Sequence, residues 1–191
     1  MVSRKQALDL LEKYIKKENT VKHMLATEAI MRELAKRFDP EHADEWGLAG
    51  LLHDIDYELI NQQTKANHGK RSVEILKKEG LDLPESVYQT ILAHVSDCYD
   101  DISPKTKMDW CLYICDSLTG LIVATALVRP SKKLADVKVK SVMKKFKQPA
   151  FAAGTRREQI SLCEQKLNIP LKEFISLSLS AMQQISDQLG L

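Results

Sequence analysis

The sequence feature that most constrains this chain is the pair His53-Asp54, which directly follows the apolar segment Gly47–Leu52. An imidazole beside an ionised carboxylate is costly to bury unless a metal ion or a basic side chain is there to be bound. Four of the five histidines, and an aspartate inside the most apolar segment, recur on what we expect to be successive helices: His23, His53, His68, His94 and Asp116. The sequence therefore predicts a fold that brings these groups to one point.

The length and composition predict one all-helical domain. A chain of 191 residues with 44% apolar and 28% charged residues can bury a substantial core. Seven glycines and six prolines are few for this length, and alternating β-branched runs are scarce. These features favour helices over strands.

Capping residues and prolines mark the expected helix starts. In the first half of the chain we expect helices from Ser3 (with Gln6 as a capping box) to about 17, from Thr20 to 38, from about 41–44 to the His53-Asp54 pair, from Asn67 to 78, and from Pro84 through His94. In the second half we expect them from Ser103-Pro104 to 128, along 139–146, from Thr155 (with Glu158 as a capping box) to about 167, and from Pro170 through Leu189. The last of these helices could seal the monomer or pair two chains, so a homodimer stays open.

The four cysteines form no CxxC pair, and no secretory leader is visible at Met1–Lys5. We therefore expect reduced thiols in a cytoplasmic protein. Cys111 and Cys115 are four residues apart on one helix face, where they would serve as small buried hydrophobes or as ligands of a soft metal.

The segment Trp110–Val128 is apolar enough to raise the question of a membrane span. It carries Asp116, Ser117, Thr119 and Gly120 in its middle, so we expect a central core helix and no contact with a membrane.

The net charge of +2 is unevenly distributed. The segment 129–157 holds ten Lys or Arg residues against one acid, Asp136, which gives it a charge of +9 and leaves −7 for the rest. Such a segment could face a polyanion, for example a nucleotide, polyphosphate or RNA, or it could be a solvated helix face. The sequence does not decide whether its basic residues fold over the predicted site: Lys132, Lys133, Lys144, Lys145, Arg156 and Arg157.

Neutral imidazoles and carboxylates suit Mn, Fe, Co, Ni or Zn, and no thiolate accompanies them. Neighbours on a helix point about 100° apart. His53 and Asp54 can therefore share one ion only if the site straddles the helix end, or if the carboxylate bridges two ions. Two ions about 3.5–4 Å apart are the usual arrangement for splitting phosphate esters. Each group alone also has an ordinary structural explanation, such as a hydrogen-bonded core histidine or an Asp116–arginine pair.

The ordered set resembles the HD superfamily of metal-dependent phosphohydrolases, which is named for an adjacent His-Asp pair on an all-helical fold. The family pattern is a histidine, the His-Asp pair and a distal aspartate, matched here by His23, His53-Asp54 and Asp116. Branches with two metals add two histidines, matched by His68 and His94. Cys115-Asp116-Ser117-Leu118 is similar to the family's closing Ala-Asp-x-Leu segment. The resemblance covers about residues 20–128 and implies a helical core over residues 1–130, with 131–191 as a C-terminal helical cap.

The resemblance implies a role for each matched residue. His23, His53, Asp54 and Asp116 would hold a first divalent ion, and Asp54, His68 and His94 a second. With one ion only, His68 and His94 would face the phosphate as hydrogen-bond donors or as general acid. The nucleophile would be a metal-bound or bridging hydroxide. Lys70 and Arg71 are candidates to bind phosphate oxygens.

One departure from the family pattern concerns charge. Signalling members and some nucleotide hydrolases carry a lysine a few residues after the pair, whereas this chain has Asp56 and Glu58 there. The negative charges of these acids disfavour a highly anionic substrate unless the positive charges of segment 129–157 offset them.

The function implied is hydrolysis of a phosphomonoester or phosphodiester, with a small nucleotide-like substrate. Two alternatives stay open: a nucleotide- or RNA-binding regulatory module with little turnover, favoured by the basic segment, and an oxygenase with a di-iron centre on the same fold.

Overall fold

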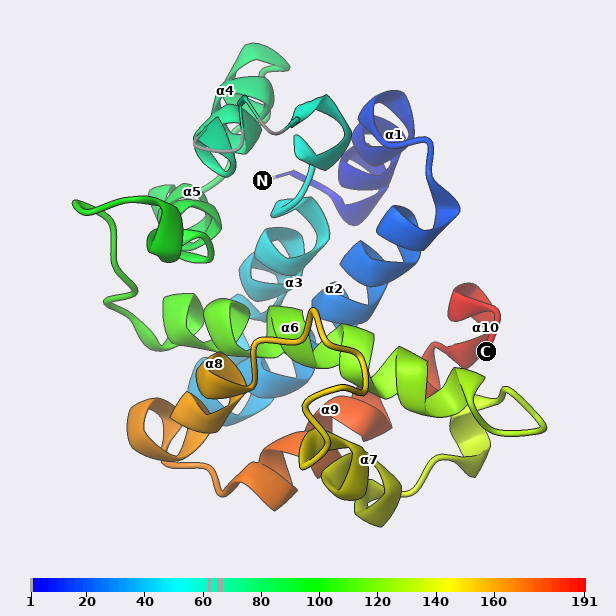
Figure 1. Cartoon of the computed structure of the whole chain (residues 1–191). Coiled ribbons are helices and arrows are strands. Elements are labelled where there is room, and N and C mark those ends of the chain that lie inside the picture. Colours follow the sequence, from blue (N-terminus) through cyan, green and yellow to red (C-terminus); the bar gives the residue numbers. More distant parts are fainter. Residues whose placement is uncertain (1, 62, 65–66) are drawn as a thin grey trace.

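The computed structural model describes residues 2–61, 63–64 and 67–191, and within them the regular structure is helical throughout, with no strand (Figure 1). The α-helices are α1 (Arg4–Tyr14), α2 (Glu18–Phe38), α3 (Ala43–Leu52), α4 (Lys70–Lys78), α5 (Glu85–Ala93), α6 (Lys107–Leu127), α7 (Val139–Phe146), α8 (Arg157–Leu162), α9 (Leu171–Gln184) and α10 (Ser186–Leu189). The all-α prediction is confirmed.

Helix α6 lies at the centre of the bundle. It crosses the middle of Figure 1, with α1–α5 on one side and α7–α9 on the other, and it packs on α2, α3, α5, α7, α8 and α9. By length and composition α6 could cross a membrane, but 61% of its most apolar stretch is buried inside the bundle. The position agrees with the core helix that its polar residues predicted.

The C-terminal helices pack on the same bundle as the N-terminal ones. Helix α9 contacts α2, and α7 and α8 contact α6. Buried side chains from both halves, among them Met24, Leu118, Phe174 and Met182, belong to one hydrophobic core. The elements that carry the predicted ligands are thus fixed by packing from both sides.

Helices α2 and α3 make the closest contact that the site depends on. A Cβ added to Gly50 would lie 2.9 Å from the backbone N of Glu28 and 2.9 Å from the carbonyl oxygen of Thr27. Glycine therefore lets α3 approach the α2 backbone within one to two turns of His23. This approach brings His23 and His53 together.

Two of the predicted helix starts in the first half need correction. The capping box of Ser3 and Gln6 is confirmed. Thr20, however, lies inside α2, which begins after Lys17. Helix α4 begins after Gly69, three residues later than the predicted start at Asn67, because Gly69 adopts a left-handed φ of 77° that ends the preceding turn.

Two starts in the second half were also wrong. Helix α6 begins after Thr106, because Thr106 and Asp109 form a reciprocal capping box that outcompetes Ser103-Pro104. The predicted Thr155–Glu158 box does not form. Helix α8 starts after Arg156, whose guanidinium has no acceptor and so cannot cap the helix.

The four cysteines are free thiols, three of them buried. Burial raises the pKa of the Cys111 and Cys115 thiols. A raised pKa disfavours the thiolate that a metal needs, so these residues act as small apolar side chains of α6.

The close contact at Gly50 can be tested by stability. Gly50→Ala should lower the free energy of unfolding by about 1–3 kcal/mol, because the added methyl group forces α2 and α3 apart. Gly120→Ala on α6 is the matched control. Its Cβ would meet no atom within 4 Å, so the loss of backbone entropy in the unfolded chain should raise stability by about 0.5–1 kcal/mol. Urea denaturation measures both, and equal effects would refute the close-contact explanation.

Candidate metal centre

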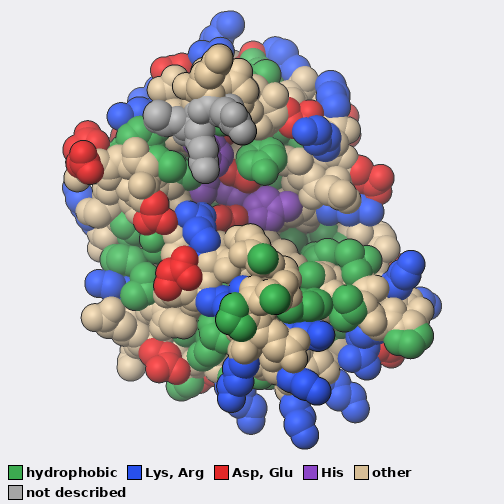
Figure 2. Space-filling model, viewed as in Figure 1, with side chains coloured by type: hydrophobic (Ala, Val, Ile, Leu, Met, Phe, Trp, Pro, Cys, Tyr) green, Lys and Arg blue, Asp and Glu red, His purple; other side chains and the backbone are tan. Residues whose placement is uncertain are grey.

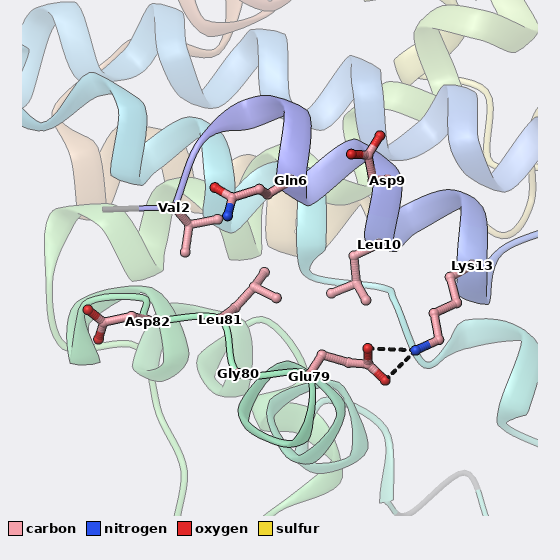
Figure 3. A pocket seen from close by; sticks show the side chains of 9 residues that line it. All are labelled: Val2, Gln6, Asp9, Leu10, Lys13, Glu79, Gly80, Leu81 and Asp82. Atoms are coloured by element: carbon pink, nitrogen blue, oxygen red, sulfur yellow. Dashed lines mark hydrogen bonds and ion pairs between the residues drawn. The ribbon is translucent and has the colours of Figure 1, made fainter.

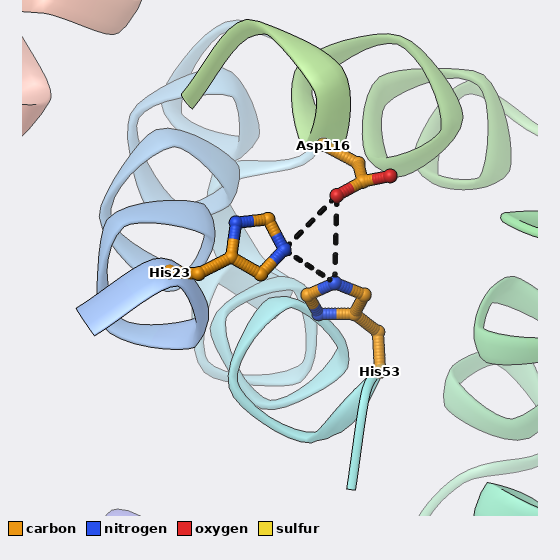
Figure 4. A group of neighbouring side chains, drawn as sticks. All are labelled: His23, His53 and Asp116. Atoms are coloured by element: carbon orange, nitrogen blue, oxygen red, sulfur yellow. Dashed lines mark hydrogen bonds and ion pairs between the residues drawn. The ribbon is translucent and has the colours of Figure 1, made fainter. Parts of the chain in front are cut away.

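The structure brings four of the predicted ligands together around one point, contributed by α2, the end of α3 and the middle of α6. The Nε2 atom of His23 lies 3.0 Å from Oδ1 of Asp116 and 3.2 Å from Nε2 of His53 (Figure 4). Nε2 of His53 lies 3.7 Å from the same Asp116 oxygen. Oδ2 of Asp54 completes the group, at 3.6 Å from His23 and 3.5 Å from His53.

The other carboxylate oxygen of Asp54 faces a second group. Its Oδ1 lies 3.2 Å from Nε2 of His68 and 3.3 Å from Nε2 of His94. The two oxygens of Asp54 thus point to two different pairs of imidazoles. This is the arrangement of a carboxylate that bridges two ions.

His53 and His94 occupy equivalent positions at helix ends. His53 directly follows α3 and His94 directly follows α5, and each Nδ1–H donates to the carbonyl three residues earlier, Gly50 (2.8 Å) and Ile91 respectively. Carbonyls of the last helical turn need such donors. Because Nδ1 is the donor of this hydrogen bond, Nε2 is the nitrogen that points to the centre, where it can hold a proton or bind a metal ion.

The other two imidazoles are oriented by side chains. Nδ1 of His68 lies 2.8 Å from Oδ1 of Asp56, and the other oxygen of that carboxylate, Oδ2, accepts the N–H of Gly69 (2.9 Å). Nδ1 of His23 lies 2.9 Å from Oγ1 of Thr119, whose own hydroxyl donates to the Asp116 carbonyl. All four histidines therefore present Nε2 to the centre.

Only one of the four histidines lies inside a helix, which corrects the expectation of histidines on successive helices. His23 is within α2, His53 and His94 follow helix ends, and His68 lies in the turn before α4. His53, which ends α3, keeps helical backbone angles (φ −58°, ψ −38°), and its Nε2 nevertheless lies 3.5 Å from Oδ2 of Asp54. The position at a helix end, and the two Asp54 oxygens that face different imidazoles, are compatible with both arrangements considered from the sequence.

The electrostatics of the centre favour a bound cation. Burial raises the pKa values of Asp54 and Asp116, but neighbouring imidazoles outweigh it and hold both carboxyls well below their usual range. Burial lowers the pKa of His53, yet the Asp54 and Asp116 carboxylates raise it to about 9. The two Nε2 atoms 3.2 Å apart would repel as lone pairs, so a proton or a metal ion must lie between them.

The two histidines of the second group, His68 and His94, differ in the protonation state that they favour. Burial lowers the pKa of His68, but Asp54 and Asp56 raise it to about 10. Burial lowers the pKa of His94 and dominates there. His94 thus favours its neutral form, which is the form that binds metal.

The centre lies at the bottom of a cavity of about 770 Å³. Figure 2 shows histidine side chains in the hollow between the two halves of the molecule, with acidic atoms beside them. The wall includes Tyr57 and Val95 on one side and the segment Ala152–Arg156 on the other. A substrate of nucleotide size fits this volume.

A second cavity, of about 520 Å³, lies between α1 and the end of α4 (Figure 3). An ion pair between Lys13 and Glu79 closes part of it. None of the predicted ligands lines it.

Lys70 and Arg71, the predicted phosphate-binding residues, are not among the residues that line the larger cavity. The ammonium of Lys70 lies 4.1 Å from the ring centroid of Tyr99, and Arg71 pairs with Glu74 at 3.0 Å. The fifth histidine, His42, pairs with Asp39 at the surface.

The acids that followed the His-Asp pair do not face the cavity. The carboxylate of Asp56 is fully buried against His68 and Gly69. Glu58 accepts the backbone N–H groups of Lys16 and Lys17. Neither acid lines the cavity, but the charge of Asp56 lies directly behind His68 and belongs to the charge balance of the centre.

Sequence reasoning missed four residues of this site. Asp56 and Thr119 orient ligands, Tyr57 borders the cavity, and Asp97 binds Arg156, which in turn lies 3.4 Å from Asp116. Asp56 carried a usable signal, since a carboxylate two residues after a metal-binding pair is a candidate to orient another ligand. No sequence spacing connects Arg156 to Asp116.

Comparison with known proteins gives one match. The family model of the HD domain matches residues 20–121, more than half of the chain. The match includes all six predicted ligands. No curated protein and no solved structure matches the chain.

Metal binding should depend on pH, because the ion displaces protons. His53 and His68, with pKa values raised to about 9 and about 10, are protonated at neutral pH and must lose that proton to bind metal. Raising the pH from about 6 to 8 should therefore tighten Mn²⁺ binding, by up to about tenfold per pH unit for each proton released. Calorimetry in buffers of different ionisation enthalpy counts the protons. An affinity that is constant over this range would contradict the ligand assignment.

Proposed function

Because the chain belongs to the HD domain family, we propose that it is a divalent-metal-dependent phosphohydrolase that acts on a small phosphate ester. The observation that carries this proposal is Asp54, whose two oxygens face two separate pairs of histidine Nε2 atoms. The fold is the one that metal-dependent phosphohydrolases of this family use.

The donor set fits Mn, Fe, Co, Ni or Zn, as the sequence predicted. Four imidazole nitrogens and two carboxylates offer borderline to hard donors without sulfur. His23, His53, Asp54 and Asp116 would hold a first ion, and Asp54, His68 and His94 a second.

The charges at the site favour two ions over one. Four carboxylates lie at or beside the centre, Asp54, Asp56, Asp97 and Asp116, and one guanidinium, that of Arg156. With neutral imidazoles, one divalent ion leaves a net charge of −1, and a second ion changes it to +1. An anionic phosphate is attracted in the second case, whereas a protonated His68 in place of the second ion makes the centre neutral.

A bound divalent ion supplies a Lewis acid and lowers the pKa of a water molecule that attacks phosphorus. The chain's own part is to hold the ligands and the substrate. Where only one ion binds, His68 is better placed than His94 to donate a proton. Its side chain is 17% exposed and backed by Asp56, whereas that of His94 is 1% exposed.

A nucleotide-like substrate is supported by the rim of the cavity. Tyr57 is 53% exposed, although it borders the cavity and lies within 6.3 Å, ring centroid to ring centroid, of His68. An exposed aromatic face beside a phosphate site can stack on a base. We therefore propose a substrate whose phosphate reaches the ions and whose base contacts Tyr57.

The central experiment combines elemental analysis with turnover of nucleotide monoesters and diesters in the presence of Mn²⁺, Co²⁺, Ni²⁺, Mg²⁺ or Fe²⁺. The wild type should hold one or two transition ions and hydrolyse at least one ester. Asp54→Asn should lower kcat by at least about a hundredfold, because it removes a charge shared by both ions. Asp44→Asn, at an exposed position paired with Arg32, is the matched control and should leave kcat unchanged.

Other outcomes would point elsewhere. Bound metal without turnover of any ester would favour the binding module, or, with iron and oxygen dependence, the oxygenase. Full metal content and full activity in Asp54→Asn would refute the site assignment.

The nucleotide preference has its own test. Tyr57→Ala should raise KM for a nucleoside monophosphate about tenfold, because stacking on an aromatic ring contributes about 1–3 kcal/mol per base. KM for glycerol phosphate, which has no base, should stay constant, and kcat should change little for either. An equal rise for both substrates would mean that Tyr57 shapes the centre itself and does not contact a base.

A further inference from the structure

We propose that Arg156 binds the phosphoryl group of the substrate and that the loop of residues 147–155 serves to hold it in place. The inference rests on the proposed function and adds a substrate-binding residue from outside the matched family region. Its evidence lies in the position of the guanidinium, in its free donors and in the contacts that fix it.

Arg156 reaches the centre from the side opposite the imidazoles. Its Nη2 lies 3.4 Å from Oδ2 of Asp116, whereas Oδ1 of the same carboxylate faces His23 at 3.0 Å. The guanidinium is thus separated from the predicted first ion by one carboxylate group. Arg156 lines the same cavity as the Asp116 carboxylate, so a phosphate group bound in that cavity can accept hydrogen bonds from it.

The guanidinium of Arg156 has N–H donors that no described residue accepts. Arginine offers five N–H groups. Three are engaged, by Asp116, by Asp97 (3.1 Å) and by Ser117 (3.4 Å). The other two, one on each terminal nitrogen, have no partner among the described residues. The side chain is 37% exposed and lines the cavity, so these donors are accessible to a phosphate, which arginine binds with two terminal nitrogens.

Asp97 fixes the guanidinium from the other side. Its Oδ1 accepts the hydroxyl of Tyr113 (2.7 Å), and its Oδ2 accepts the amide of Gln159 (2.6 Å) as well as Arg156. The contact of Arg156 with Asp97 is shorter than that with Asp116. Arg156 is therefore held beside the metal ligand without depending on it, as a substrate-binding group should be.

The loop that carries Arg156 is organised by the next residue. The guanidinium of Arg157 donates to the backbone carbonyls of Phe146 (2.8 Å), Gln148 (3.0 Å), Phe151 and Thr155. The loop crosses α6 in Figure 1, between α7 and α8. Arg157 uses four of its five N–H donors on these carbonyls and does not line the cavity, so the two adjacent arginines have separate roles.

The test uses inorganic phosphate as the probe on the full-length, Mn²⁺-loaded protein, with binding measured by calorimetry and metal content by elemental analysis. Arg156→Gln should weaken phosphate binding about tenfold to a hundredfold, because a charged pair of hydrogen bonds is lost. Arg156→Lys keeps the positive charge but loses the paired terminal N–H donors. Its phosphate affinity should therefore lie between those of the wild type and Arg156→Gln. Arg37→Gln, which removes an exposed arginine paired with Glu173, is the matched control and should bind phosphate like the wild type.

Steady-state kinetics add a second readout. Arg156→Gln should raise KM for the best ester found, with a smaller change in kcat than Asp54→Asn causes, and with the metal content of the wild type. Unchanged phosphate affinity in Arg156→Gln would overturn the proposal. A loss of metal in that variant would overturn it too, because Arg156 would then support Asp116 as a ligand.

Failure of the phosphohydrolase proposal can be distinguished from failure of the Arg156 proposal. If the wild type itself binds no metal or hydrolyses no ester, the phosphohydrolase proposal fails before the variants are compared. If the wild type binds phosphate and turns over, only the comparison of Arg156→Gln with Arg37→Gln decides the role of Arg156.

Discussion

The centre depends on one buried carboxylate, that of Asp54. Its side chain is 10% exposed and has imidazole nitrogens within 3.2–3.6 Å of its two oxygens. Burying this charge would cost several kcal/mol without compensation, which either the protonated imidazoles of His53 and His68 or a metal ion must supply. A cation at the centre removes that cost. The stability of the fold and the binding of metal are therefore coupled through this group, and any ion that binds the native centre also stabilises the bundle.

Helix ends supply the geometry that a metal needs. The imidazoles of His53 and His94 each satisfy a carbonyl of the last turn of their helix, and this hydrogen bond fixes both the tautomer and the direction of Nε2. One interaction thus caps a helix and orients a ligand.

The sequence was sufficient for the fold class, the family and the grouping of the six ligands, because helical periodicity and an ordered set of histidines and aspartates are local signals. It was insufficient where two local signals competed, as at Thr106 against Ser103-Pro104. The contacts of Lys70 with Tyr99 and of Arg71 with Glu74 could not be predicted either, since nearness to His68 in the chain does not decide which way a side chain points. The pairing of Arg156 with Asp116 depends on packing between distant segments, which no local pattern encodes.

The basic segment 129–157 illustrates why net charge alone did not predict a function. Its charges divide among different tasks: Arg157 binds backbone carbonyls, Lys145 lies 4.2 Å from the ring centroid of Phe151, and Arg156 lies beside Asp116. Two of these positive charges hold a loop, and one enters the cavity. Because that loop forms a wall of the cavity, a fragment ending at residue 130 would keep all six predicted ligands and still lack the cation that offsets Asp97 and Asp116. The charge balance of the centre thus depends on the C-terminal segment as much as on the ligands.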